Sequence, residues 1–409
     1  MTGVQTCALP ILLSVANSVA DENYFVVRVD HNLTAKDSLF ARYIRDTADV
    51  VLPLATSPIP LYPQHDLTNN QFATLEWKRL ISPTVVNLAR TSFLRPTEQS
   101  VLPNSIPALS YFSGRPDGRV LVNGLSQVGP VQDDPFRLYV NHYVVGDDVI
   151  WSLGAHSLRM GANLDRTQDN TVVSAGNGGA WTFNSLLQFL QGTATQLQAP
   201  PVGFDDTTRD MRELFFTPYV QDEWKVLPRL TLNLGLRYEW NANPSERLNK
   251  LTNFVELPTG SLQKVPNAYA RNPSKNNWAP RVGFAWDVQG NGRTAVRGGF
   301  GIFHQLILGN YLNAVAKKNP PYAATIVVTG QPAQAITVAN SQAYTAQVGP
   351  SLLSPNLSPT LVDALAEFIQ YNLDPSYDMK FNLSLDRELL PNLALSMQYV
   401  GSQIGRAHV

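Results

Sequence analysis

The sequence predicts an all-β protein: a partial transmembrane antiparallel β-barrel of about 12 strands, arranged as six hairpins. Three observations lead to this prediction. Charged residues make up only 15% of the 409 residues, against roughly 25% in soluble globular proteins. Several segments alternate strictly between apolar and polar side chains, which a strand converts into two contrasting faces. Short connections alternate with long ones, as the periplasmic turns and extracellular loops of outer-membrane barrels do.

Composition excludes several other classes of protein. Lys and Arg number 31 and Asp and Glu 32, a formal net charge of −1, so no positive excess favours nucleic acid as a partner. The single cysteine excludes a disulfide framework and a multi-cysteine metal site. No apolar run approaches the roughly 18 residues that a membrane helix needs. The 26 glycines and 29 prolines instead predict many turns.

Segment 230–241, LTLNLGLRYEWN, shows the alternation most clearly. Segments 157–166, 281–287, 379–386 and 393–399 repeat it. Their apolar faces predict contact with lipid, for which we single out Leu232, Leu234, Leu383 and Leu395. Their polar faces predict the lining of a water-filled lumen. The candidate lumen-facing residues are Arg159, Asn163, Asp165, Asn233, Arg237, Glu239, Arg281, Arg297, Lys380, Asn382 and Asp386.

The twelve predicted strands form six successive hairpins. In order, these are 24–30 with 38–45, 70–80 with 84–95, 139–151 with 157–166, 215–225 with 230–241, 279–288 with 293–303, and 377–388 with 392–401. Turn-forming residues mark several short connections, such as Ser82-Pro83 and Gln289–Gly292. The connections between hairpins are long: 46–69, 96–138, 167–214, 242–278 and 304–376. Repeated loops beyond about 15 residues are uncommon in compact soluble domains.

A soluble β-sandwich would produce the same alternation, but strand length separates the two alternatives. Predicted strands of 10–13 residues match a tilted membrane-spanning strand, whereas ordinary strands average about 5–6 residues. Aromatic residues near strand ends, including Trp151, Trp224 and Trp286, fit the interfacial girdles of a membrane barrel. The membrane barrel is therefore favoured.

No residue pattern points to an enzyme, a cofactor or a metal. Residues 290–295 match the dinucleotide-binding pattern G-x-G-x-x-A, but that motif needs a following helix and segment 294–303 is predicted as a strand. The glycines therefore predict a hairpin turn. The six histidines show no ligand spacing, and no G-x-S-x-G suggests a hydrolase serine. We assign no catalytic, cofactor-binding or metal-ligating residue.

A helix is predicted over residues 359–373, inside the longest loop. Pro359 stands at its first position, Leu361, Leu365 and Phe368 follow at helical spacing, and Asp374-Pro375 ends it. Such a helix could organise the loop. It could also serve as a lid over the lumen or as a partner site.

The two ends differ from the rest of the sequence. Residues 1–20 contain an apolar stretch, but no Lys or Arg precedes it, which argues against a signal peptide. MTGVQTCALPI (1–11) and IGRAHV (404–409) resemble translated sequencing-adapter sequence. We therefore expect a non-native or unstructured end over 1–20, a barrel over 21–403 and an adapter-like end over 404–409.

Five segments resemble the barrel of TonB-dependent outer-membrane receptors, in particular the Oar-like group with an N-terminal carboxypeptidase-regulatory-like domain. They include YVQDEWKVLPRLTLNLGLRYEW (219–240) and NWAPRVGFAWDVQGNGRTAVRGGFGIF (277–303), with 23–43, 81–93 and 385–402 in the same order as in the family. The resemblance implies uptake of an unidentified bulky ligand across the outer membrane of a Gram-negative-type bacterium. It implies outer-membrane lipid, an extracellular ligand and the TonB complex as partners, the last acting through a plug.

The resemblance also implies segments that we do not find in this sequence: the regulatory-like domain, a plug and a TonB box. Large transporter barrels have about 22 strands, so twelve would be a fragment comprising wall and extracellular loops. Twelve strands predict either an open curved sheet, with unpaired edges at 24–30 and 392–401, or a smaller closed barrel. A passive porin and an adhesion or secretion barrel are the alternative functions.

Overall fold

The structure is a computed structural model. It describes residues 14–56, 60–106, 110–132, 135–174, 176–256, 262–305, 319–330, 333, 336–348, 363–365, 369–373 and 376–405. None of the helices in these ranges is long and apolar enough to cross a membrane.

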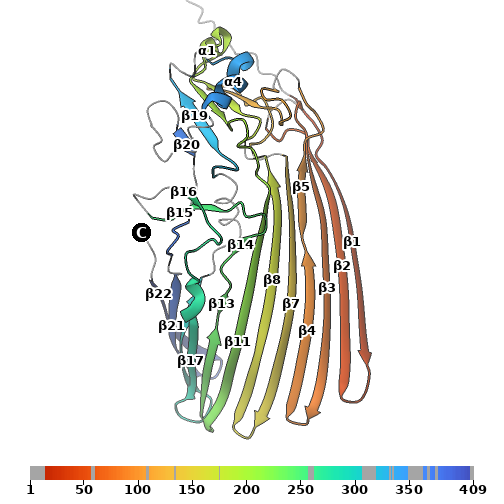
Figure 1. Cartoon of the computed structure of the whole chain (residues 1–409). Coiled ribbons are helices and arrows are strands. Elements are labelled where there is room, and N and C mark those ends of the chain that lie inside the picture. The colour runs from red at the N-terminus through yellow and green to blue at the C-terminus, as the bar shows by residue number, and fades with distance from the viewer. Residues whose placement is uncertain are drawn as a thin grey trace, which may run out of the picture.

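All twelve predicted strands are present and pair consecutively in one antiparallel sheet, which we call the wall (Figure 1). In order they are β1 (Val19–Asn32), β2 (Asp37–Leu52), β3 (Gln64–Ser82), β4 (Val85–Arg95), β7 (Phe136–Leu153), β8 (His156–Val173), β11 (Arg209–Leu227), β12 (Leu230–Tyr238), β17 (Trp278–Asp287), β18 (Thr294–His304), β21 (Tyr377–Leu390) and β22 (Leu393–Gly405). The predicted fold class is confirmed. Within the described residues β1 pairs only with β2 and β22 only with β21, so the wall is an open, curved sheet.

Tight turns join the strands at the end of the wall opposite the long connections. Gly154 has φ +58 and Asn392 φ 70, backbone conformations that glycine and asparagine tolerate best. In the turn after β17, Asp287 accepts hydrogen bonds from the backbone N–H groups of Gly290 (2.9 Å) and Gly292 (2.8 Å). The G-x-G-x-x-A segment is therefore a hairpin turn followed by strand β18, as predicted.

The strands run further toward the long connections than predicted. β11 begins at Arg209 rather than at 215, and β3 begins at Gln64 rather than at 70. These extensions carry polar residues on both faces, so the alternation that located the strands is lost there, although backbone pairing continues. At the two ends of the chain, β1 begins at Val19, inside the segment 1–20, and β22 ends at Gly405, inside 404–409.

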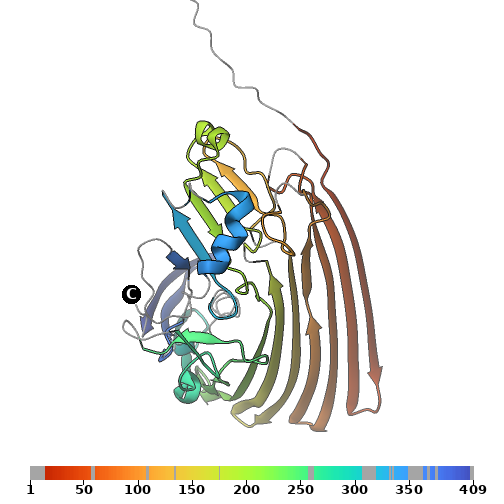
Figure 2. The same cartoon turned by 45° about the horizontal axis from the view of Figure 1, so that its top comes forward.

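Three of the long connections fold together into a second sheet, which we call the loop cap (Figure 2). Its strand order is β20-β19-β10-β9-β6. The strands are β6 (Arg119–Val122), β9 (Ala180–Phe183), β10 (Gln196–Ala199), β19 (Thr325–Thr329) and β20 (Asp363–Leu365), accompanied by the helices α1 (Leu186–Gln191) and α4 (Val338–Val348). The sequence predicted these connections as long loops, with a helix over 359–373 in the last of them.

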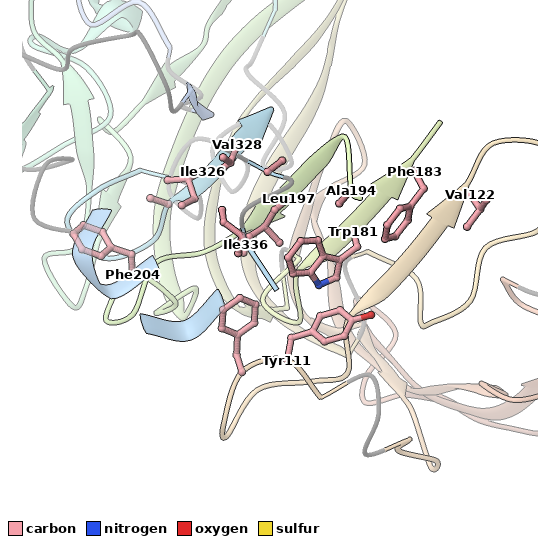
Figure 3. Close-up of a cluster of buried hydrophobic side chains, with 14 residues drawn as sticks. Tyr111, Val122, Trp181, Phe183, Ala194, Leu197, Phe204, Ile326, Val328 and Ile336 are labelled. Atoms are coloured by element: carbon pink, nitrogen blue, oxygen red, sulfur yellow. The ribbon is translucent and has the colours of Figure 1, made fainter. Parts of the chain in front are cut away.

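The main hydrophobic core of the described residues lies in the loop cap, not in the wall (Figure 3). Leu197, Ile326 and Val328 have no exposed surface, and the ring of Trp181 meets that of Tyr111 edge-on at 6.2 Å. The wall instead leaves apolar side chains such as those of Leu383 and Leu395 exposed on one face. The loop cap buries its own apolar side chains, which stabilises it in water.

A second, smaller core attaches the connection after β12 to the wall. It contains Met211 from β11 with Leu251, Val265, Ala268 and Tyr269. The connection carries β13 (Trp240–Asn241), β14 (Ser245–Glu246), β15 (Thr252–Phe254), β16 (Leu262–Lys264) and the 3-10 helix η2 (Pro273–Asn276). β5 (Thr97–Val101) extends the wall beside β3 and β7.

The predicted helix over 359–373 is not formed where the structure describes this segment. Asp363–Leu365 form strand β20, which pairs antiparallel with Thr325–Val327 of β19. Local helical spacing is a weak signal, and pairing with a distant strand overrides it here. Residues 359–362, 366–368 and 374–375 lie outside the described residues.

Candidate functional site: the polar face of the wall

The strand register places the predicted polar residues on a single face of the wall. Residues directly opposite each other in an antiparallel pair project to the same side. One row across β8, β11, β12, β17, β18 and β21 consists of Arg159, Gln221, Gly235, Arg281, Gly301 and Lys380. The next row across β11 to β21 consists of Glu223, Asn233, Gly283, Gly299 and Asn382.

The other candidate residues follow the same register. Asn163 and Asp165 continue from Arg159 along β8 in steps of two residues, and Arg237 lies opposite Tyr219 of β11. Arg297 and Asp386 form an ion pair with each other on this face. Glu239 lies between β12 and β13, where its Oε1 is 3.2 Å from Nε of Arg237. The register thus places ten of the eleven candidates on this face. Arg237 forms an ion pair with the eleventh, Glu239.

Two hollows lie side by side on this polar face. The first, of about 340 Å³, is lined by Arg159, Asn163, Arg237 and Arg281 among the predicted residues. The second, of about 560 Å³, is lined by Asn233, Arg281, Lys380 and Asn382. Arg281 belongs to both. These seven candidates therefore form one continuous polar surface.

Sequence reasoning missed several polar residues of the first hollow. Asp148 of β7 accepts a hydrogen bond from Tyr219 and pairs with Arg159 across 3.3 Å. Arg90 of β4 also lines this hollow and pairs with Glu76 of β3. Strands β4 and β7 mix apolar residues into the polar face, so their alternation is weaker and gives no clear signal.

The opposite face of the wall is apolar and solvent-exposed in the isolated chain. Leu234, Leu383 and Leu395 are 37%, 52% and 43% exposed. An exposed apolar surface of this extent marks contact with lipid or with another protein. Trp286 and Trp151 lie on this face close to the tight turns, where an aromatic girdle is expected.

Polar pairs on neighbouring strands interrupt the apolar face of the described wall. Asn87 of β4 donates a hydrogen bond of 2.6 Å to Asp147 of β7. His156 lies 2.7 Å from Asp222 beside the tight turns. Adjacent residues of a strand project to opposite faces, which places Asp147 on the apolar face and Asp148 on the polar face.

Comparison with known proteins gives the family. The family model of the outer membrane beta barrel domain matches residues 10–408. The chain belongs to this family. Its location is accordingly the outer membrane. No curated protein matches the sequence.

Solved structures with a similar fold include two receptors. The siderophore receptor PirA from Acinetobacter baumannii matches with a TM-score of 0.52 and 11% identity, over 95% of this chain and 43% of that chain. A mutant of the ferric enterobactin receptor PfeA from Pseudomonas aeruginosa matches with a TM-score of 0.53 and 9% identity, over 96% and 44%. At these identities the likeness shows the fold alone. The chain spans less than half the length of these receptors.

Two titratable residues, Glu213 and His142, lie on the polar face of this outer membrane beta barrel domain, toward the long connections. Glu213 of β11, Thr167 of β8 and His142 of β7 lie in one row. The neighbouring rows carry Arg166 and Arg212 on the outward side, which places the group outside the hydrocarbon region. His142 Nδ1 lies 2.9 Å from Oγ1 of Thr167. No group of three or more His, Cys, Asp and Glu among the described residues is arranged to hold a metal.

Two pKa values in this group are shifted upward. Burial raises the pKa of Glu213 to about 7, and the negative charge of Asp169 adds to the shift. The interaction with Asp165 raises the pKa of His142, whose Nδ1 lies 3.6 Å from the Asp165 carboxylate. Protonated Glu213 and protonated His142 are therefore the forms that the fold favours.

These shifts predict that the domain loses stability as pH rises from about 4.5 to about 7. In that window the folded state binds the Glu213 proton more tightly than the unfolded chain does, so stability is greatest below it. The contribution of His142 is likewise lost as pH rises through its raised pKa. Glu213→Gln should make the thermal midpoint less dependent on pH between 5 and 8, as measured by circular dichroism. Glu22→Gln in the exposed strand β1 is the control, and an unchanged pH slope in Glu213→Gln would contradict the expectation.

Proposed function

We propose that the chain forms the barrel wall and extracellular loops of a TonB-dependent outer-membrane receptor of the Oar-like group, which takes up a bulky ligand that is not yet identified. The observation that carries the proposal is the continuous polar face that crosses the wall from β8 to β21. In a barrel of this family such a face lines the lumen. We assign Arg159, Asn233, Arg281, Lys380 and the other candidates to it.

The covering of the polar face supports this assignment. Met211 follows the register of Tyr219 along β11 and so lies on the polar face, where Leu251, Val265 and Tyr269 bury it. The connection after β12 therefore folds over the polar face at this point. Loops that fold inward over a lumen narrow its extracellular mouth, as the uptake of a selected ligand requires.

The open edges of the wall support a larger barrel. Unpaired backbone groups cannot face lipid, because hydrocarbon offers them no hydrogen-bonding partner. Strands β1 and β22 therefore need further strands beside them, which we propose are supplied by the complete receptor. Residues 21–403 are then its barrel portion. Its proposed partners are outer-membrane lipid, the extracellular ligand and, through a plug, the TonB complex.

The proposal predicts a closed, energy-coupled receptor. We expect the periplasmic domain of TonB to bind the complete protein in detergent, as measured by calorimetry. Liposomes carrying the complete protein should not swell in isotonic arabinose, because a plugged lumen excludes small sugars. Swelling at the rate of a general porin, together with no TonB binding, would contradict the proposal and favour a passive pore.

A further inference from the structure

The second hollow of the polar face contains two cations that share one aromatic ring. Arg281 of β17 and Lys380 of β21 lie opposite Gly301 on either side of β18. The guanidinium carbon of Arg281 is 4.7 Å from the centroid of the Phe303 ring, and the Lys380 Nζ is 5.5 Å from it. The glycine makes this possible, because a Cβ at Gly301 would lie 3.0 Å from the Phe303 ring.

These two cations differ from three other basic residues among the candidates. Arg159 pairs with Asp148, Arg237 with Glu239, and Arg297 with Asp386. Across the ranges that the structure describes, no carboxylate lies within 4.0 Å of the charged nitrogens of Arg281 or Lys380. A cation–π contact contributes about 0.5–2 kcal/mol but leaves the positive charge in place. The hollow thus concentrates positive charge that is not neutralised.

Glycines leave space in the hollow that side chains would otherwise fill. Gly235, Gly283 and Gly299 join Gly301 in its lining, and glycine inside a strand costs roughly 0.5–1 kcal/mol relative to alanine. The wall itself does not require glycine throughout, because a Cβ at Gly235 or Gly299 would meet no atom closer than 3.7 or 3.5 Å. Glycines in a strand interior often mark the close approach of a ligand or another chain segment.

The rim of the hollow is amide-rich. Gln221, Asn233 and Asn382 line it, and each side-chain amide offers both donors and an acceptor. Asn233 and Asn382 bracket Gly283 and Gly299 in one row of the wall. A ligand in the hollow would therefore meet two positive charges and the hydrogen-bonding groups of three side-chain amides.

We propose that this hollow is a carboxylate-binding site, in which carboxylate groups pair with Arg281 and Lys380. Such a group can belong to a soluble organic acid, or to an Asp or Glu side chain of another segment of the complete protein lying in the lumen. Both sources share the same recognition chemistry, a charge-assisted pairing with two cations. The site is a property of the wall and does not depend on TonB-driven transport.

The test uses the complete protein extracted from outer membranes in detergent, with succinate as the probe and calorimetry and thermal unfolding as the readouts. Arg281→Gln and Lys380→Gln remove one cation each. Gly299→Val keeps both cations and fills the hollow with a residue that strands favour. Arg297→Gln is the matched control, since it removes a cation of the same face that already has a carboxylate partner and does not line the hollow.

If a soluble acid is the occupant, succinate should bind the wild type and Arg297→Gln equally, and at least tenfold more weakly in the three hollow variants. If a side chain of the protein is the occupant, succinate should not bind, and Arg281→Gln and Lys380→Gln should lower the thermal midpoint more than Arg297→Gln does. Inorganic phosphate, tested in parallel, should bind more weakly than succinate. Hollow variants that match Arg297→Gln in both readouts would overturn the proposal.

Discussion

Replacing Leu234 with arginine is expected to destabilise the folded barrel by about 2–4 kcal/mol, the cost of an arginine on the lipid face near the bilayer midplane. Leu234 lies in the middle of β12, on the apolar face, between Asp222 of β11 and Val282 of β17. The adjacent Asn233 lies on the polar face beside Glu223 and Gly283. Asn233→Arg should therefore be far milder, because its new charge enters a hydrated polar surface and not lipid.

The two variants form a matched pair, since they place the same side chain at neighbouring positions of one strand. Folding free energies are measured by reversible denaturant titration of the complete protein in lipid bilayers. A second pair, Leu383→Arg and Asn382→Arg in β21, repeats the comparison on another strand. Equal losses within each pair would show that the two faces are wrongly assigned.

Trp181→Ala is expected to destabilise the loop cap by about 3–5 kcal/mol, the usual cost of removing a buried tryptophan side chain. Trp181 is 4% exposed and meets Tyr111 within a core drawn from three separate connections (Figure 3). The wall does not share this core. We therefore expect the loop cap to open locally while the wall stays folded.

Limited proteolysis of intact cells measures the opening of the loop cap, and the heat-dependent mobility of the protein on gels measures the folding of the barrel. Trp181→Ala should increase cleavage within 110–132 and 176–205, which belong to the loop cap and its connections, without changing the mobility shift. Leu190→Ala removes a side chain of α1 that is 73% exposed, so it should change neither readout. Loss of the mobility shift in Trp181→Ala would mean that the wall depends on the loop cap.

The sequence predicted the wall well, because a strand between lipid and a polar interior must carry two different faces. That requirement is local, and it repeats every second residue along 230–241 and 379–386. It located all twelve strands and grouped the polar residues from Arg159 to Asp386 before any pairing was known. It also led to the correct interpretation of Gly290 and Gly292 as a turn.

The predictions were less accurate outside the segments in which apolar and polar residues alternate. Above the apolar band the strands continue with polar residues on both faces, so their ends were misplaced. Arg90 and Asp148 were missed because β4 and β7 carry apolar residues on both faces. The helix over 359–373 was wrong at Asp363–Leu365, because its partner strand β19 lies more than 30 residues away in the chain.

The amino-acid sequence by itself determined the number of strands in the wall, their order and the chemistry of their two faces, since each follows from neighbouring residues meeting lipid or water. Only the tertiary structure decided the loop cap, the cluster around Glu213, and the meeting of Arg281 and Lys380 at Phe303. Each of these joins residues from connections or strands far apart in the chain. Their contacts depend on register and on long-range pairing, which leave no periodic signal in the sequence.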